Sequence, residues 1–291
     1  MFIYINNSIV SKEQAKLSAF DHGFMYGLGL FETFRVEDGH PFLLDDHFQR
    51  LQEGLDSIGV EWRVTREDAV NIIQDLLKSN KLKDAYVRWN VSAGPGEIGL
   101  YTGTYTKPTT IVYMKPLPPG PFKEKDAVIL SLKRNTPEGP TRLKSHHYLN
   151  NVLAKRELGT AEHVEGIFLN EAGHVAEGIV SNVFWIKDEM VYTPAISTGI
   201  LDGITRRFVL TLLEKQGIPA RVGLYNPNEL LSADAAFITN SIQEIVPLKN
   251  CNETHYNDKH DMIARLRNEF DKYRTKLWSR DELLRRNKID K

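Results

Sequence analysis

Apolar residues along this chain recur with two different periods, which predict both strands and helices. A period of two predicts strands, and in the first half of the chain it is found at 2–5, 9–10, 30–36, 85–91 and 109–114. A period of three to four predicts helices, and it is found there at 44–58 and 65–80. The residues between the first two strands, Asn6-Asn7-Ser8, are typical of a hairpin turn because asparagine tolerates positive φ. We therefore predict that the first half contains a sheet and two helices.

The second half shows the same mixture of periods. Strands are predicted at 127–132, 166–169, 175–177, 182–186, 190–192, 234–241 and 245–248. Helices are predicted at 152–158, 199–215 and 259–284. The last of these has mixed charges and is interpreted as a solvated amphipathic helix with no assigned function.

A proline-rich segment divides the two halves. Residues 116–121 contain four prolines, which favour a stiff, extended connection rather than a helix or a sheet. The chain has 291 residues, enough for two domains of ordinary size. We predict a small N-terminal domain at 1–115, a linker at 116–121 and a large C-terminal domain at 122–291.

Composition and charge narrow the class of protein. Hydrophobic residues make up 41% of the chain and charged residues 26%, as in soluble globular proteins, and no apolar run approaches the roughly 20 residues of a membrane-spanning helix. The formal net charge of -1 gives no broad field to attract nucleic acid or an anionic membrane. Cys251 is the single cysteine, and the first residues do not have the pattern of a secretion signal. We therefore expect a cytoplasmic protein without a nucleic-acid or membrane partner.

Two residues near the middle of the chain carry the strongest chemical signal. Lys144 has Arg142, His146 and His147 close in sequence, and nearby cations lower the pKa of an amine so that it can attack a carbonyl group. Glu177 follows a predicted strand in an apolar setting, where a carboxylate needs a cationic or hydrogen-bonding partner. A solvated loop lysine and an internal ion pair are the ordinary alternatives for these two residues.

Two arginines lie where an anion can bind. His47 and Arg50 are one turn apart on a predicted helix, so both project beside its apolar stripe. Arg88 shares one face of its predicted strand with Tyr86. For Arg50 the alternatives are a surface salt bridge and a phosphate site, and for Arg88 they are an internal ion pair and a substrate carboxylate.

Two turns in the second half are suited to a phosphate. The helix predicted to open within 199–207 exposes the amides of its first turn beside a glycine and the Thr205 hydroxyl, and a helix N-terminus attracts anions. The strand at 234–241 ends in a turn rich in hydroxyl and amide groups. The glycine-rich segment 21–29, in contrast, leads into a strand and lacks the Gly-Lys-Ser/Thr of a nucleotide loop, so no nucleotide site is predicted there.

Together these groups are the parts needed to hold pyridoxal 5'-phosphate. A lysine can bind its aldehyde, a carboxylate can keep its ring nitrogen protonated, and an arginine with two anion-binding turns can hold its phosphate. The bound cofactor withdraws electrons from a substrate. No metal site is predicted.

The chain resembles the fold-type IV pyridoxal-phosphate family over nearly its whole length. The motifs that carry the resemblance are Phe31-Glu32-Thr33, His47-Phe48-Gln49-Arg50-Leu51, Leu143-Lys144-Ser145, Ala176-Glu177-Gly178, Gly203-Ile204-Thr205-Arg206 and Thr239-Asn240-Ser241. The family contains branched-chain aminotransferases, D-amino-acid aminotransferases and 4-amino-4-deoxychorismate lyases. The resemblance implies an α+β fold with a small α/β sandwich domain and a larger β-barrel-like domain surrounded by helices.

The resemblance also implies roles for individual residues. Lys144 corresponds to the lysine that forms a Schiff base with the cofactor, and Glu177 to the partner of the ring nitrogen. The implied phosphate ligands are Arg50, Ile204, Thr205 and Ser241. Because the family forms its site at a dimer interface, a homodimer acting on a small-molecule substrate is implied as well.

Residues outside the cofactor motifs separate the activities of the family. Ala93 stands where D-amino-acid enzymes carry an arginine that grips a carboxylate. Tyr86-Val87-Arg88 resembles the Tyr-x-Arg of branched-chain enzymes, which keeps that activity as the alternative. Leu149, however, stands where those enzymes usually place a tyrosine. The run 142–151 looks most like bacterial aminodeoxychorismate lyases, and Thr33 resembles the position proposed there to relay protons.

The resemblance thus implies a lyase that converts 4-amino-4-deoxychorismate to 4-aminobenzoate and pyruvate in folate biosynthesis. Lys144 would remove a proton from the carbon that bears nitrogen, and Thr33 would protonate the leaving group. Arg88 and Tyr86 would bind the substrate. A relative that binds the cofactor without catalysis is a third interpretation, against which the intact motifs argue.

Overall fold

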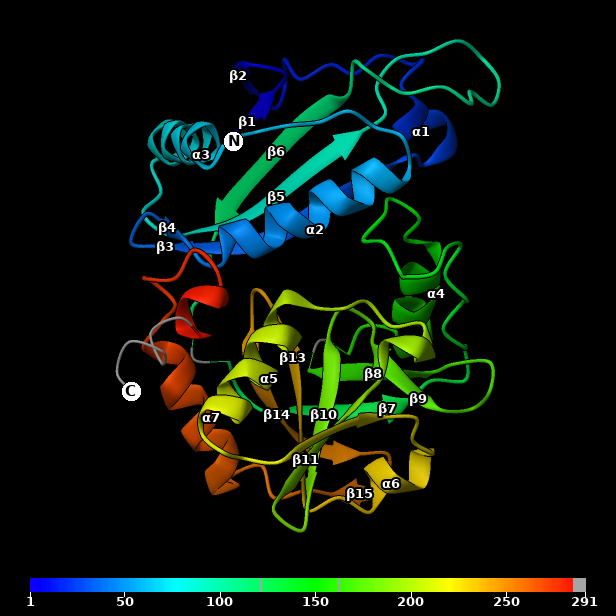
Figure 1. The fold of residues 1–291 in the computed structure, drawn as a ribbon, viewed down its shortest axis with the longest axis vertical. Helices are drawn as coiled ribbons and strands as arrows, with labels where there is room; N and C mark the ends of the chain where they lie inside the picture. The colour runs from blue at the N-terminus through cyan, green and yellow to red at the C-terminus, as the bar shows by residue number, and fades with distance from the viewer. Residues whose placement is uncertain (121, 162, 285–291) are drawn as a thin grey trace. The chain divides into compact units, whose positions relative to one another are not determined.

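The computed structural model of the chain describes residues 1–120, 122–161 and 163–284. The chain divides into two compact units. Unit 1 comprises Met1–Pro118, Leu143–His147 and the segment that begins at Arg274, and unit 2 comprises Pro119–Arg142 and Tyr148–Tyr273. Each unit combines helices with a sheet (Figure 1), which confirms the predicted α+β class.

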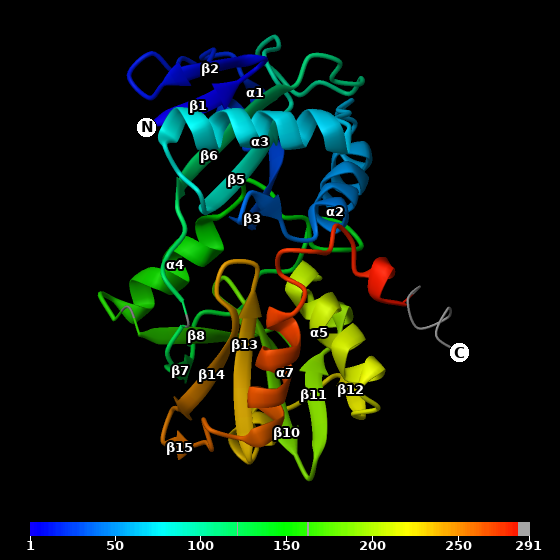
Figure 2. The ribbon, with the colours of Figure 1, turned by 90° about the vertical axis from the view of Figure 1, so that its left-hand side faces the viewer.

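Unit 1 is built on a six-stranded antiparallel sheet with the strand order β2-β1-β6-β5-β3-β4. Its strands are β1 (Phe2–Ile5), β2 (Ser8–Ser11), β3 (Gly29–Glu37), β4 (His40–Pro41), β5 (Ala85–Ser92) and β6 (Thr109–Pro116). Its helices are α1 (His22–Tyr26), α2 (Leu44–Ser57) and α3 (Arg66–Asn80). α2 contacts β3, and α3 contacts β1 and β6, so both helices cover one face of the sheet (Figure 2). The core of the unit lies between that face and the two helices.

Most predicted elements of unit 1 are confirmed. Asn6 and Asn7 have positive φ in the turn between β1 and β2, and the Thr65 hydroxyl caps α3 by accepting from the Asp68 amide. Neither Asp45 nor Asp46 caps α2, because the helix starts at Leu44, before both of them, and Leu43 at its N-cap provides no side-chain cap. The short helix α1 was not predicted, because five residues are too few for a helical period to show.

Unit 2 contains a nine-stranded mixed sheet, in which eight strands follow the order β12-β11-β10-β13-β14-β7-β8-β9 and β15 pairs with β14. Its strands are β7 (Lys125–Ile129), β8 (Val164–Leu169), β9 (Val175–Gly178), β10 (Asn182–Lys187), β11 (Met190–Pro194), β12 (Ala220–Gly223), β13 (Ala235–Asn240), β14 (Glu244–Cys251) and β15 (Thr254–His255). Its helices are α4 (Leu149–Leu158), the 3-10 turn η1 (Ile196–Thr198), α5 (Ile204–Lys215), α6 (Pro227–Leu231) and α7 (Asp261–Asp271). β9 ends the strand order yet contacts β10, so the sheet curls strongly.

The two units do not coincide with the predicted domains, because residues 143–147 and the segment that begins at Arg274 belong to unit 1. The first change of unit falls between Pro118 and Pro119, inside the predicted linker, whose last residue, Pro121, lies outside the described residues. Residues 143–147 group with unit 1 because they run beside β3, where the Phe31 amide donates to the Lys144 carbonyl at 2.9 Å.

The second segment is the end of the chain, where the predicted helix 259–284 is wrong in its extent. α7 ends at Asp271, and the chain then continues without regular helix to Ser279. The carbonyls of Leu277 and Trp278 accept from the amides of Leu43 and Asp45 at the start of α2. Leu277 is fully buried, so this segment is not a solvated helix face. The segment provides hydrogen-bond acceptors for backbone amides at the start of α2, which has no side-chain cap.

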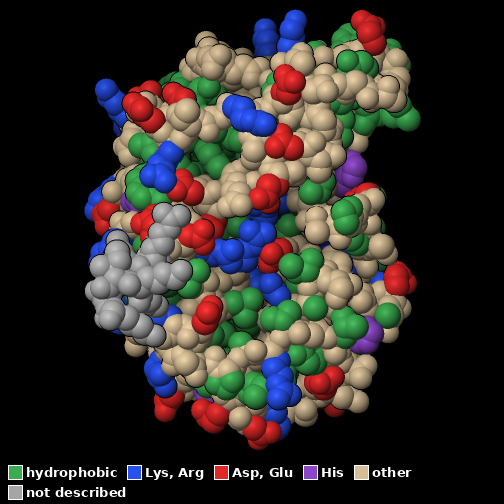
Figure 3. All heavy atoms as spheres, viewed as in Figure 1, with side chains coloured by type: hydrophobic (Ala, Val, Ile, Leu, Met, Phe, Trp, Pro, Cys, Tyr) green, Lys and Arg blue, Asp and Glu red, His purple; other side chains and the backbone are tan. Residues whose placement is uncertain are grey.

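The surface carries charges of both signs. Figure 3 shows acidic and basic side chains interspersed over the face that it draws. Within the described residues, no helix has the length and apolar character needed to cross a bilayer.

Candidate active site

The face of the unit 1 sheet that α2 and α3 leave uncovered carries several polar side chains. Residues alternate between the two faces of a strand, so Thr33 faces away from the core that buries Phe34. Thr33 lies directly opposite Arg88 in the pairing of β3 with β5, and Tyr86 follows two residues along on the same face. The structure therefore places Thr33, Arg88 and Tyr86 on one face of the sheet. The strand pattern predicted this for Arg88 and Tyr86, but not that Thr33 lies opposite Arg88.

Arg88 forms no ion pair with any described residue. Its Nε donates to the Asn90 Oδ1 at 3.1 Å, and its guanidinium carbon lies 3.6 Å from the centre of the Phe31 ring. The sequence left open whether Arg88 is paired within the fold or available to a carboxylate. The geometry favours the second role, because a half-buried guanidinium without a carboxylate partner is suited to bind an anion.

Lys144 lies beside the start of β3. A β-bridge joins Ser145 to Leu30, and the His146 amide donates to the Gly29 carbonyl at 2.9 Å. The Lys144 amine lies 4.6 Å from the centre of the Phe31 ring. Phe31 is thus contacted by the amine of Lys144 and also by the guanidinium of Arg88. The glycine at position 29 permits this packing, because a Cβ there would lie 2.5 Å from the His146 ring.

The cations expected around Lys144 are only partly present. Burial, assisted by Arg88, lowers the pKa of His146 to about 4, so its imidazole is neutral at neutral pH. The prediction that His146 adds positive charge near Lys144 is therefore wrong. Arg142 belongs to unit 2, where its Nε donates to the Gly199 carbonyl at 2.5 Å. Within unit 1, Arg88 is the cation that shares the Phe31 ring with Lys144.

Arg50 is held by a residue to which the sequence gave no role. The Glu32 carboxylate accepts from the Arg50 Nε and Nη2, each at 2.7 Å, and from the His47 Nδ1 at 2.7 Å. The predicted one-turn spacing of His47 and Arg50 is confirmed, since both reach the same carboxylate. The sequence did contain a signal that Glu32 has cationic or hydrogen-bonding partners, because it falls at an apolar position of the β3 pattern, where a carboxylate requires them.

Glu177 is at the end of β9 in unit 2, and both of its carboxylate oxygens accept hydrogen bonds. Oε1 accepts from the Arg134 Nε at 2.8 Å, and Oε2 accepts from the Leu201 amide at 2.9 Å. Arg134 is anchored in turn by the Asn150 Oδ1 at 2.7 Å. Sequence analysis missed Arg134, because no motif or period marks it. The carboxylate is buried but fixed and compensated, as a partner of a protonated ring nitrogen must be.

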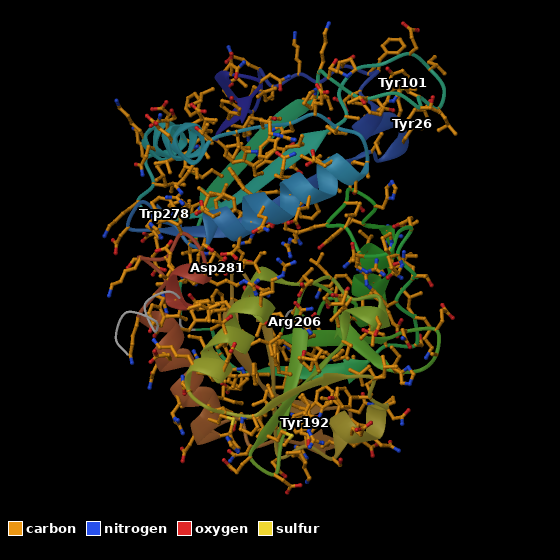
Figure 4. All side chains as sticks on the ribbon, in the orientation of Figure 1. Tyr26, Tyr101, Tyr192, Arg206, Trp278 and Asp281 are labelled. Carbon is orange, nitrogen blue, oxygen red and sulfur yellow. The ribbon has the colours of Figure 1, made fainter. Side chains whose placement is uncertain are left out.

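The start of α5 forms an anion-binding turn in unit 2. Gly203 is the N-cap and provides no side-chain cap, and the first turn contains no acidic residue. A Cβ at Gly203 would lie 2.1 Å from the Asn182 Oδ1, so only glycine fits. The Thr205 hydroxyl lies 3.4 Å from the Ser241 hydroxyl, which follows β13. The Nη1 of Arg206, a residue labelled in Figure 4, donates to the Asp202 Oδ1 at 3.0 Å.

This donor set fits a phosphate group. It consists of the first amides of a helix without a side-chain cap, which include that of the buried Ile204, and two neighbouring hydroxyls. In unit 1, the half-buried guanidinium of Arg50 is oriented by Glu32. These groups, Lys144 and Glu177 are the parts that the sequence assigned to pyridoxal 5'-phosphate.

Comparisons with known proteins show similarity over most of the length of this chain. The profile of the amino-transferase class IV family matches residues 29–251. An aminodeoxychorismate lyase of Bacillus subtilis is 48% identical over 257 residues, which cover 87% of this chain and 88% of that protein. A putative branched-chain-amino-acid aminotransferase of Methanocaldococcus jannaschii is 35% identical over 95% of this chain and 97% of that protein.

Among solved structures, the fold is similar to that of the branched-chain amino acid aminotransferase of Escherichia coli. The TM-score is 0.85 at 26% sequence identity, with 94% of each chain covered. The predicted two-domain fold of this class is confirmed.

Proposed function

Because this chain belongs to the amino-transferase class IV family, we propose that it is a pyridoxal 5'-phosphate-dependent lyase, which converts 4-amino-4-deoxychorismate to 4-aminobenzoate and pyruvate. The observation that carries the proposal is the extensive identity with the Bacillus subtilis lyase, which covers most of both chains. The run 142–151, the lyase-like part of the sequence, contains the proposed cofactor lysine.

In this proposal the cofactor-binding residues divide among three parts of the cofactor: its aldehyde, its ring nitrogen and its phosphate. Lys144 binds the aldehyde, and Glu177 accepts from the protonated ring nitrogen, so that the ring withdraws electrons from the substrate. The proposed phosphate ligands are Arg50, Ile204, Thr205 and Ser241. The uncapped start of α5 supports the roles of Ile204 and Thr205.

The reaction requires the chain to move two protons. Once the substrate amine has displaced Lys144 from the aldehyde, the freed Lys144 amine would take the proton from the carbon that bears nitrogen, and the bond between the neighbouring carbon and the enolpyruvyl oxygen would break. Thr33, directly or through a water molecule, would deliver a proton to the departing oxygen, so that the enol of pyruvate leaves and the substrate ring becomes aromatic. The enol then tautomerises to pyruvate. Arg88 holds a substrate carboxylate, with Tyr86 beside it. The positions of Thr33 and Arg88 opposite each other on β3 and β5 support this assignment.

The direct test supplies enzymatically prepared 4-amino-4-deoxychorismate and measures 4-aminobenzoate and pyruvate. We expect equal amounts of the two products, and no more than slow turnover of leucine with 2-oxoglutarate by the same preparation. Rapid transamination without release of 4-aminobenzoate would contradict the lyase assignment while leaving the family assignment intact.

The role of Thr33 is tested with Thr33→Val, which keeps the shape of the side chain and removes its hydroxyl. We expect pyruvate release to slow about 100-fold, because proton transfer by a positioned group contributes that much, while the absorption spectrum of the bound cofactor is unchanged. Thr33→Ser retains a hydroxyl and serves as the control. An unchanged rate in Thr33→Val would remove this residue from the mechanism.

A branched-chain aminotransferase is the second candidate. It is favoured by Tyr86 and Arg88 on one sheet face and by the relative from Methanocaldococcus jannaschii. A D-amino-acid aminotransferase is less well supported, because Ala93 stands where those enzymes carry an arginine. The leucine control in the direct test separates the branched-chain activity from the lyase.

We also propose that the chain is a homodimer and acts in the cytoplasm, in the synthesis of folate. Unit 1 exposes large apolar side chains near α1 and in the loop at 96–101, with 75% of Phe24, 76% of Ile98 and 88% of Leu100 accessible. Such a cluster is typical of a surface that another chain covers. Light scattering coupled to gel filtration should give twice the mass of the chain, and a monomeric mass would contradict the dimer.

A further inference from the structure

We propose that Glu32 and His47 are positioning residues for the Arg50 guanidinium, and that they thereby set a preference for a phosphorylated cofactor over its unphosphorylated form. The inference rests on the proposed function, in which Arg50 binds the cofactor phosphate. It adds two residues that do not themselves touch the cofactor.

The pairing of Glu32 with Arg50 is a two-pronged contact. Oε1 accepts from Nε and Oε2 accepts from Nη2, each at 2.7 Å. The Glu32 side chain is 1% exposed and that of Arg50 is 13% exposed, so water competes little for either group. Because a guanidinium is planar, two parallel hydrogen bonds fix both its plane and the direction of its remaining nitrogen.

His47 fixes the carboxylate in turn. Its Nδ1 lies 2.7 Å from the Glu32 Oε2, and its ring packs against Phe34 at 5.5 Å between centres. Burial lowers the pKa of His47 despite the opposing effect of Glu32. The imidazole is therefore neutral at neutral pH. Since an ionised carboxylate only accepts hydrogen bonds, the proton of this neutral ring must be on Nδ1.

The charges of this cluster leave little net attraction for an anion. Burial would raise the pKa of Glu32, but Arg50 and His47 outweigh it and lower the pKa to about 2, so the carboxylate stays ionised. The charge of Glu32 then offsets that of Arg50 within this pair. The direction of the Arg50 N–H groups therefore weighs more in the binding of a phosphate than the charge of the pair does.

Strand alternation separates this cluster from the reacting groups. Glu32 projects toward α2, whereas its neighbours Phe31 and Thr33 project to the opposite face of β3. Glu32 consequently has no direct route to the substrate side of the strand. Replacing Glu32 is therefore expected to weaken binding of the cofactor phosphate through Arg50. The affinity for the phosphorylated cofactor, compared with that for its unphosphorylated form, measures this effect.

The test measures the dissociation constants of the full-length protein, freed of cofactor, for pyridoxal 5'-phosphate and for pyridoxal. Their ratio is the phosphate preference. Glu32→Gln keeps the length and removes the charge, and Glu32→Asp keeps the charge and shortens the reach. Glu37→Gln is the matched control, because Glu37 is on the same strand and pairs with Arg35 at 3.0 Å and Arg274 at 3.3 Å.

We expect both Glu32 variants to lower the phosphate preference about tenfold, as loss of a residue that orients a ligand does. The affinity for pyridoxal should stay within about twofold. His47→Gln should lower the preference about threefold, and Glu37→Gln should leave it unchanged. In an Arg50→Lys background, Glu32→Gln should lower the phosphate preference by less than about a further twofold, because the two residues act as one unit.

An unchanged or increased preference in the Glu32 variants would overturn the inference, because it would mean that Glu32 only neutralises Arg50. If Glu32→Gln fails to fold, Glu32→Asp and His47→Gln give the same decision. Failure of the proposed function is distinct. In that case the unmodified protein would bind neither aldehyde, or Arg50→Lys would leave its phosphate preference intact.

Discussion

Both units of the molecule contain buried glutamates, and the pKa values of Glu32 in unit 1 and Glu165 in unit 2 are shifted in opposite directions. Glu32 in unit 1 is 1% exposed and Glu165 in unit 2 is 4% exposed. Despite burial, Arg50 and His47 lower the pKa of Glu32 to about 2. Burial raises the pKa of Glu165, because Lys125 is 3.9 Å away and too distant to compensate. Charged donors at hydrogen-bond distance, rather than burial, therefore decide whether an interior carboxylate stays ionised.

Glu177 extends the comparison within unit 2. Its carboxylate is as buried as that of Glu165, but the Arg134 Nε lies 2.8 Å away and the Leu201 amide 2.9 Å away. Glu165 accepts from the Ile179 amide at 2.7 Å and has no arginine partner among the described residues. The two carboxylates with arginine partners are those connected to the proposed cofactor site, and Glu165 is not.

The largest expected effect is on the stability of unit 1. Glu32→Gln leaves the Arg50 guanidinium buried without its counter-charge, and breaking a buried pair in this way costs about 3–5 kcal/mol. Chemical denaturation should show this loss at neutral pH. Glu37→Gln should cost less, because the Glu37 carboxylate is 23% exposed, against 1% for Glu32, and water can compensate for its loss. Equal losses in the two variants would contradict the special role of the Glu32 cluster.

The next effect separates the two glutamates of unit 2 by activity. Glu177→Gln should lower the rate of 4-aminobenzoate formation about 100-fold, because a charge aimed at the reacting system is typically worth that much. Glu165→Gln should leave the rate within about twofold. Comparable losses in both variants would indicate that Glu177 supports the fold rather than the reaction.

The pH dependence of stability sharpens the comparison, because the two pKa shifts have opposite signs. The pKa of Glu32 falls from 4.5 to about 2, so its contribution is fully present above about pH 4.5 and is lost as the pH falls through 2. The difference in unfolding free energy between the unmodified protein and Glu32→Gln should be constant from pH 5 to 8 and shrink toward pH 2. A difference that does not change with pH would show that charge is not involved.

The smallest effect is expected at Glu165. A raised carboxyl pKa means that the folded state favours the protonated form, so ionisation of Glu165 lowers the free energy of unfolding as the pH rises above 4.5. Glu165→Gln keeps an acceptor for the Ile179 amide and should stabilise the protein by about 1 kcal/mol at pH 8, with little change at pH 4. Thermal unfolding at the two pH values measures this, and destabilisation at pH 8 would contradict it.

Much of this arrangement was predictable from local sequence. The alternation at β5 placed Tyr86 and Arg88 on one face, and the spacing of His47 and Arg50 placed both on one side of α2, because each pattern repeats over consecutive residues. The register that sets Thr33 opposite Arg88 was not predictable from alternation. A helix was predicted to open within 199–207, and α5 starts there, at Ile204.

The partners of these residues were not predictable in the same way. Arg134 reaches Glu177 across 43 positions of the chain, and Leu277 accepts from the amide of Leu43. No period or motif encodes such distant pairs. The neutral state of His146 also depends on its burial in the folded chain, and sequence neighbours alone suggested the opposite.

The proposed function depends above all on the bond between Lys144 and the cofactor aldehyde. Borohydride reduction of the protein loaded with pyridoxal 5'-phosphate, followed by peptide mapping, identifies the lysine that forms this bond. We expect a single pyridoxyl label on the peptide that contains Lys144, and no such label in Lys144→Ala. A label on another lysine, or none in the unmodified protein, would contradict it.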